Sequence, residues 1–191
     1  MKVSRIGAEP KGGLLLVGLG RQRELEGLAE VAARLAAVEG VALRQLAGAG
    51  DPDAGLAALT AEAAGPWLAA LPLDPGLPLE RGGSWAEALG AWRQPCLLVR
   101  RGEQLDTGLP AAGAALLERW RVPLAGLLQV GGDWDPAERR RDGLAWLGWL
   151  PEIGEAEIGE IAGIAAIERN EQAMAALQQV LRSRWRVLQA A

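Results

Sequence analysis

One stretch, residues 95–151, constrains the fold of this chain more than any other. Short apolar runs alternate there with helical segments, in the order PCLLVRRG, DTGLPAAGAALLERW, VPLAGLLQVGG, DPAERRRDG and LAWLGWLP. The order strand, helix, strand, helix, strand is typical of a parallel sheet with helices on its faces. We therefore predict a three-layer α/β fold with a mostly parallel sheet.

The residues before this stretch repeat the same alternation. We expect strands over 14–17, 41–46 and 67–73, and helices over 24–38, 52–64 and 85–92. The first strand is a continuous apolar run, which indicates burial on both faces. Asp51 and Ser84 are expected to cap the second and third helices, with Glu87 completing a capping box after Ser84.

The end of the chain has a different character. Residues 153–168 form a glycine-containing quasi-repeat, and a strong helical signal follows. One apolar stripe runs along the expected helix, formed by Met174, Leu177, Leu181, Trp185 and Leu188. We predict an α/β domain over residues 1–152, with 153–191 as a helical extension that packs on the same domain.

Composition excludes several kinds of function. The 191-residue chain contains no histidine, so a Ser-His-Asp or Cys-His centre and His ligation of zinc are ruled out. A net charge of −4 argues against a nucleic-acid partner. Cys96 is the single cysteine and fits a reducing compartment, where we expect it to be a buried, inert thiol. No apolar run is long enough for a membrane span, so we expect a cytoplasmic protein.

The turn after the first strand is the first candidate site. Gly18 and Gly20 could bring backbone N–H groups to an anion at a helix start, with Arg21 and Arg23 as cationic partners. A P-loop would need a Lys and a hydroxyl residue after the glycines, and a dinucleotide fingerprint would need a glycine at position 23. A tight strand-to-helix turn that requires glycine for backbone reasons alone is the competing interpretation.

Other candidates lie at the ends of later strands. Asp74 follows the third strand, where metal or substrate ligands sit in open α/β sheets, although Asp-Pro-Gly is also a common turn former. Residues 81–84 combine an arginine with free N–H groups, and residues 100–102 and 106–107 could line the same crevice. We expect residues 139–141 to be a solvated helix face.

The central block resembles the C-terminal half of dethiobiotin synthetase and, more loosely, the MinD/ParA-type P-loop ATPases. The similarity is carried by PCLLV, LLERWRVP, LAGLLQVGG and LGWLPE, over residues 82–152. It implies a P-loop-NTPase-like strand order and places Gln129 and Pro151 where that family contacts the nucleotide base. Gln129 stands where the family has Asn, and the P-loop Lys and hydroxyl are missing from this sequence.

We therefore expect a degenerate dethiobiotin synthetase-like protein that is non-catalytic or regulatory. Its C-terminal helix could contact a second copy or another protein, although packing back on the domain is the commoner fate of such a stripe. One alternative is an active ATP-dependent ligase or carboxylase that uses ATP and magnesium. A second alternative is a Rossmann-type binder of a small molecule or dinucleotide. No metal ligand is predicted.

Overall fold

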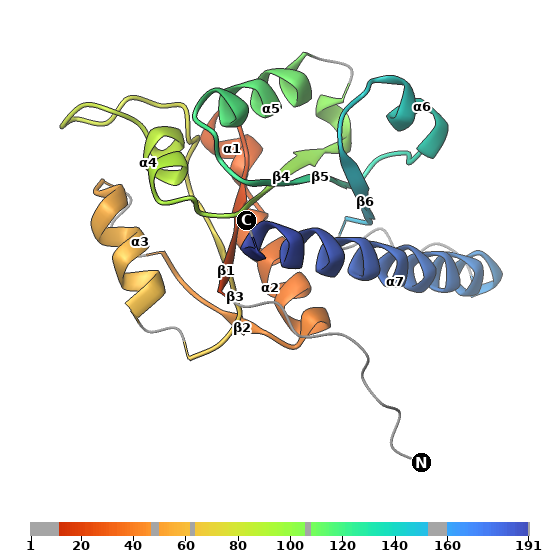
Figure 1. Cartoon of the computed structure of the whole chain (residues 1–191). Coiled ribbons are helices and arrows are strands. Elements are labelled where there is room, and N and C mark those ends of the chain that lie inside the picture. Colours follow the sequence, from red (N-terminus) through yellow and green to blue (C-terminus); the bar gives the residue numbers. More distant parts are fainter. Residues whose placement is uncertain (1–11, 47–49, 62–63, 106–107, 153–159, 191) are drawn as a thin grey trace.

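A computed structural model describes residues 12–46, 50–61, 64–105, 108–152 and 160–190. It contains a six-stranded sheet in the order β2-β3-β1-β4-β5-β6, in which every pair of neighbouring strands is parallel (Figure 1). The predicted α/β fold with a C-terminal helix is confirmed. The strands are β1 (Gly13–Val17), β2 (Ala42–Leu43), β3 (Trp67–Ala70), β4 (Cys96–Arg101), β5 (Leu124–Val130) and β6 (Trp146–Leu150).

Helices cover both faces of this sheet. They are α1 (Gln22–Leu25), α2 (Leu28–Glu39), α3 (Pro52–Ala61), α4 (Trp85–Ala91), α5 (Leu109–Arg119), α6 (Pro136–Arg141) and α7 (Glu160–Ala190), with a short 3₁₀ turn over Gly102–Gln104. Side chains of α2 and α7 fill the core on one face. Side chains of α3, α4 and α5 fill it on the other face. Strand β1 lies between β3 and β4, and all five of its residues are buried, as its apolar run predicted.

Three boundaries differ from the sequence prediction, and one of them is the strand expected over 67–73, which ends at Ala70. The helix expected over 24–38 is two helices, because Gly27 adopts a left-handed conformation with φ of +82° and breaks the first from the second. The strand expected over 41–46 is confined to Ala42–Leu43. This strand lies at the sheet edge, where it has one neighbour, and Leu43 is half exposed. The number of neighbouring strands, which the local apolar pattern does not encode, limits β2.

The predicted helix caps are present. The Asp51 carboxylate accepts a hydrogen bond from the Ala54 N–H at 3.1 Å, and the Ser84 hydroxyl accepts one from the Glu87 N–H at 3.3 Å. These contacts satisfy backbone donors that a helix start otherwise leaves free. Among the described residues, none of the helices combines the length and apolarity that a membrane crossing requires.

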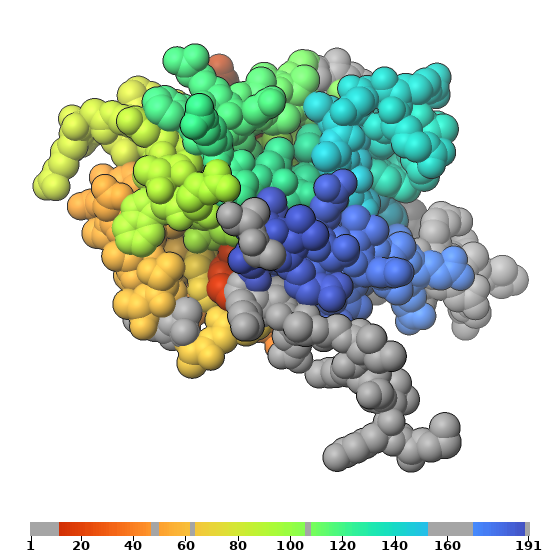
Figure 2. All heavy atoms as spheres, viewed as in Figure 1, coloured from red at the N-terminus to blue at the C-terminus, as the bar shows by residue number. Residues whose placement is uncertain are grey.

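Helix α7 lies against β5 and β6 and forms part of the molecular surface along its other side (Figure 2). The predicted stripe faces the sheet: Leu177, Leu181 and Trp185 are fully buried, and Met174 and Leu188 pack beside them. Gly148 of β6 allows the close approach, since a Cβ placed there would stand 3.4 Å from Leu177. The stripe is therefore part of the core.

A polar contact ties α7 to the end of α2. The Arg182 guanidinium donates to the Glu39 carboxylate at 2.5 Å, and the Gln178 amide donates to the Val38 carbonyl at 2.9 Å. Burial raises the pKa of Glu39, and the hydrogen bond and charge of Arg182 partly offset that rise. Arg182 therefore favours the ionised form of a buried carboxylate at the α2–α7 contact.

Arg182→Met should destabilise the protein at neutral pH by about 1–3 kcal/mol, because it leaves the buried Glu39 carboxylate without its charged partner. The loss should be smallest at acid pH, where Glu39 is protonated, and should grow as the pH rises through the raised pKa of Glu39. Urea unfolding across this pH range measures it. Arg184→Met, at an exposed position on the same helix, is the matched control. Equal and pH-independent losses in the two variants would contradict the role given to Arg182.

Candidate functional site

The connections between strands change face at β1. The helices that follow β1 cover the face shared with α7, whereas the helices after its neighbours β3 and β4 cover the opposite face. In open α/β sheets, ligands bind beside the carboxyl ends of strands at such a point. The candidate turn at Gly18–Arg21 and the candidate acid Asp74 both lie there.

The structure brings this turn and Asp74 into contact. The Gly20 N–H donates to Asp74 Oδ2 at 2.7 Å, and the Gly76 N–H donates to the other carboxylate oxygen, Oδ1, at 2.8 Å. The next N–H along the turn, that of Arg21, donates to the Glu24 carboxylate. Two carboxylates of the chain therefore hold the adjacent N–H groups that point out of this turn.

Glycine is required at position 20 for two reasons. Its φ is +120°, a conformation that residues with a Cβ rarely adopt. A Cβ at this position would also overlap the Glu24 carboxylate. The positive φ of Gly20 therefore favours glycine at this turn, and the Glu24 carboxylate lies against the turn.

A buried arginine lies under the same turn. Arg100 of β4 is 1 % exposed, and its Nη1 donates to the Leu19 carbonyl at 3.0 Å. Its Nε and Nη2 atoms have no hydrogen-bond partner among the described residues. Burial lowers the pKa of Arg100, and the negative charges of Glu24 and Asp74 oppose this shift. The two carboxylates on the turn therefore help to compensate a buried cation.

The other two residues of the predicted anion site point elsewhere. Arg21 and Arg23 are exposed, at the start of the four-residue helix α1. The Arg21 backbone N–H donates to the Glu24 carboxylate. The guanidinium that is buried under the turn belongs to Arg100. The predicted glycines and Asp74 are thus brought together, without a side-chain contact from either arginine among those described.

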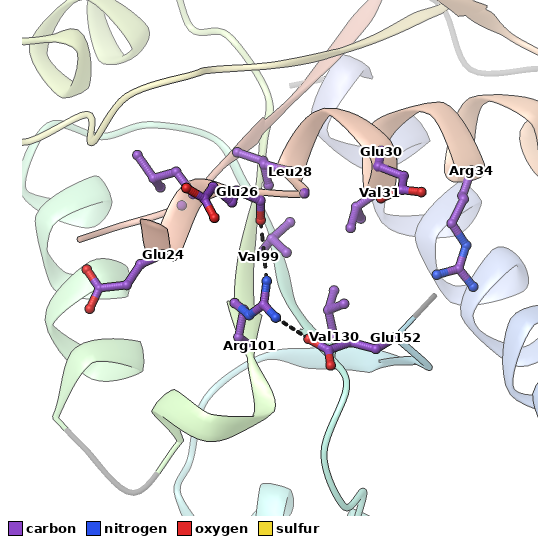
Figure 3. Close-up of a pocket in the computed structure, with 13 residues that line it drawn as sticks. Glu24, Glu26, Leu28, Glu30, Val31, Arg34, Val99, Arg101, Val130 and Glu152 are labelled. Carbon is purple, nitrogen blue, oxygen red and sulfur yellow. Dashed lines mark hydrogen bonds and ion pairs between the residues drawn. The ribbon is translucent and has the colours of Figure 1, made fainter. Parts of the chain in front are cut away.

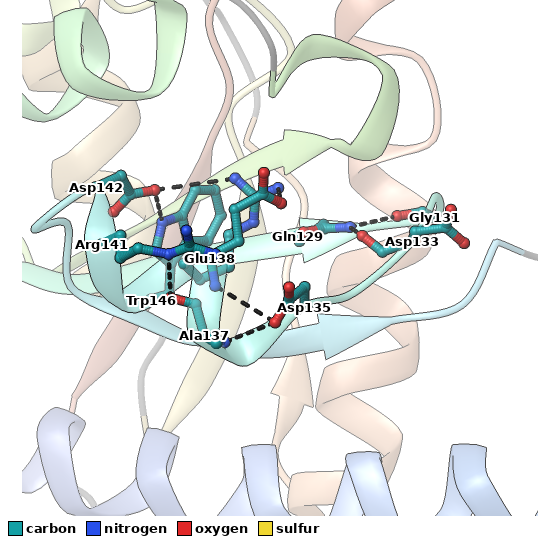
Figure 4. A network of polar contacts seen from close by, with 10 residues as sticks. Gln129, Gly131, Asp133, Asp135, Ala137, Glu138, Arg141, Asp142 and Trp146 are labelled. Carbon is teal, nitrogen blue, oxygen red and sulfur yellow. Dashed lines mark hydrogen bonds and ion pairs between the residues drawn. The ribbon is translucent and has the colours of Figure 1, made fainter.

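The residues predicted to contact a base lie at the ends of β5 and β6. Gln129 is fully buried, and its Nε2 donates to the carbonyls of Gly131 and Asp133 at 2.9 and 2.8 Å (Figure 4). The Pro151 carbonyl accepts a hydrogen bond from Arg34 Nη1 at 2.8 Å. The Gln129 Nε2 and the Pro151 carbonyl are thus engaged within the chain, whereas the buried Gln129 Oε1 has no hydrogen-bond partner among the described residues.

That loop carries a small polar network (Figure 4). Asp135 caps α6, and hydrogen bonds from the Ala137 and Glu138 N–H groups lower the pKa of its carboxylate. Arg139 differs from the solvated position predicted for it. Its guanidinium lies 5.6 Å from the ring centre of Trp146, and its side chain is only 11 % exposed. Stacking on an indole explains the difference, since a flat cation gains from the π face.

The remaining candidates do not join the turn. Arg81 is 87 % exposed, and its guanidinium lies 4.0 Å from the Asp51 carboxylate. Residues 106–107 lie outside the described part of the chain. Cys96 is fully buried, and burial strongly raises the pKa of its thiol, so it is not an activated nucleophile.

Sequence reasoning missed Glu24 and the burial of Arg100. An acid three residues after a helix N-cap is a recognised sign that its carboxylate turns back to the backbone, so Glu24 carried a usable signal. No sequence signal indicated the burial of Arg100, because that burial depends on the central position of β4 in the sheet.

The strand order and direction define the class of fold. The chain has an all-parallel, six-stranded α/β sheet consistent with a P-loop or Rossmann-like fold. Within the described residues, no group of His, Cys, Asp or Glu side chains could hold a metal ion. A scan against protein families and a search of curated proteins found no match to the chain.

Proposed function

We propose that this chain is a non-catalytic relative of the dethiobiotin synthetase and MinD/ParA-type P-loop proteins, with a regulatory rather than an enzymatic role. One observation carries the proposal. The Gly20 and Arg21 N–H groups, which in a P-loop would bind phosphate oxygens, donate instead to the carboxylates of Asp74 and Glu24.

Charge supports the same conclusion. A triphosphate at this turn would meet two carboxylates, and like charges about 4 Å apart repel by about 1 kcal/mol in bulk water and by about 4 kcal/mol near a protein surface. The buried Arg100 donates to the Leu19 carbonyl through Nη1, and its positive charge already interacts with the charges of both acids. The sequence also lacks the P-loop Lys that would reach the β and γ phosphates. Nucleotide binding would therefore require the displacement of both carboxylates.

The regulatory part of the proposal requires a partner surface. The apolar stripe of α7 is buried on the sheet, so it is not free for this purpose. A second copy or another protein that used this helix would meet its outer side, where Val180 and Val187 are 40 % and 62 % exposed.

Thermal unfolding of the full chain with ATP and magnesium at millimolar concentration tests the proposal. We expect no stabilisation, because a ligand at 100 times its Kd would stabilise the folded state by about 2.7 kcal/mol and would be visible. Saturable stabilisation that Arg21→Ala or Arg23→Ala weakens would overturn the proposal and favour the alternative of an active nucleotide-dependent enzyme.

A further inference from the structure

A cavity lies at the carboxyl edge of the sheet, on the face that α2 shares with α7 (Figure 3). It is a cavity of about 220 Å³ between the α1–α2 segment and the ends of β4, β5 and β6. Its floor is apolar and is formed by buried side chains, namely Leu25, Leu28, Val31, Val99 and Val130. An apolar floor of this kind favours a ligand with an apolar body.

The two arginines at the cavity are already engaged. Arg101 pairs with the Glu152 carboxylate and donates to the Glu26 carbonyl, and these two contacts cross the cavity (Figure 3). Its Nε also lies 3.2 Å from the Glu103 carboxylate. Arg34 donates to the Pro151 carbonyl. An anionic ligand would therefore have to compete with existing partners for either guanidinium.

The carboxylates at the cavity outnumber these arginines. Four glutamates line it, at positions 24, 26, 30 and 152, against two guanidinium groups. Glu152 pairs with Arg101 and Glu24 accepts from the Arg21 N–H, whereas no ion pair is recorded for the Glu26 and Glu30 side chains among the described residues. The rim therefore has an excess of negative charge above an apolar floor.

We propose that this cavity binds a small organic cation, an aliphatic amine or guanidine, whose apolar body lies on Val31, Val99 and Val130. The cationic head then faces the Glu26 and Glu30 rim. The volume is below the 300–1,000 Å³ or so of usual ligand pockets, which limits the ligand to a short chain. The cavity adjoins the Gly18–Arg21 turn and shares Glu24 with it, but the proposed contacts with Val31, Val99, Val130, Glu26 and Glu30 do not involve the N–H groups of Gly20 and Arg21.

The test is a titration of the full chain, with methyl-labelled Val and Leu, by n-butylammonium and n-butylguanidinium. Butan-1-ol and butyrate have the same alkyl chain without the positive charge. We expect saturable shifts of the Val31, Val99 and Val130 methyl signals with the two cations, and weaker binding of the neutral and anionic probes. Added salt should weaken cation binding, because the rim charges are accessible to solvent.

Glu30→Gln should weaken binding of the cations by roughly threefold to tenfold, as expected for the loss of one partly exposed ion pair. Glu118→Gln makes the same change on the exposed surface of α5, on the opposite face of the sheet, and should leave binding unchanged. Glu26→Gln is the second test if Glu30→Gln lowers the melting temperature. Equal binding of all four probes, binding untouched by both cavity variants, or no saturable shift at tens of millimolar probe would overturn the proposal.

Discussion

Trp185→Ala should reduce the free energy of unfolding by about 3–5 kcal/mol, the range expected when a large buried aromatic side chain is deleted. Trp185 is fully buried in the core between α7 and the sheet, four residues after the equally buried Leu181. A buried indole removes about 150–250 Å² from water, and helix α7 is too long to fill the vacated space by a local shift. Urea unfolding followed by far-UV circular dichroism measures the loss.

Two further variants serve as comparisons for Trp185→Ala. Val187→Ala changes a residue of α7 that is 62 % exposed, and its effect should stay within about 0.5 kcal/mol of zero. Trp185→Phe should lie between the two, because the Trp185 Nε1 atom has no hydrogen-bond partner among the described residues and only volume is lost. If Trp185→Ala were as mild as Val187→Ala, α7 would not belong to the core, and its stripe would be free for a partner.

The layered fold could be predicted because its signals are local. Each strand from 95 onward is a short apolar run, and the stripe on α7 recurs every three or four residues, so both follow from hydrophobic spacing. The break at Gly27 and the short edge strand β2 could not be predicted in the same way. They depend on a positive φ and on the number of neighbouring strands, which only the assembled sheet determines.

The candidate site was predicted in part for the same reason. Position after a strand was enough to single out Gly20 and Asp74, since the carboxyl ends of parallel strands share one edge. Their hydrogen bond joins residues 54 positions apart, and no sequence spacing indicates it. Arg100 shows most clearly which features of the site the sequence does not predict. Its charge suggested a residue at the crevice, whereas its central strand places it beneath the turn.

The second large effect is expected at Gly90, where two physical effects oppose each other. Gly90 lies in α4, and helix propensity alone predicts that Gly90→Ala stabilises the protein by about 1 kcal/mol. A Cβ at this position, however, would overlap the Trp120 carbonyl oxygen and stand 2.9 Å from its carbonyl carbon. The obstacle is backbone at the end of α5, so no side-chain rotation relieves it.

Steric overlap should therefore determine whether Gly90→Ala stabilises or destabilises the protein. Overpacking of this kind typically costs about 1–3 kcal/mol and sometimes more, and here the backbones of α4 and α5 must separate, so we expect a net loss of about 2 kcal/mol or more. Gly65→Ala is the control for an added methyl group without steric overlap, because a Cβ there meets nothing within 4 Å and the residue is exposed and outside the helices. Thermal unfolding of both variants measures the loss. Stabilisation by Gly90→Ala would mean that α4 and α5 separate at little cost, whereas the expected loss would show that the steric cost at their backbone contact exceeds the gain in helix propensity.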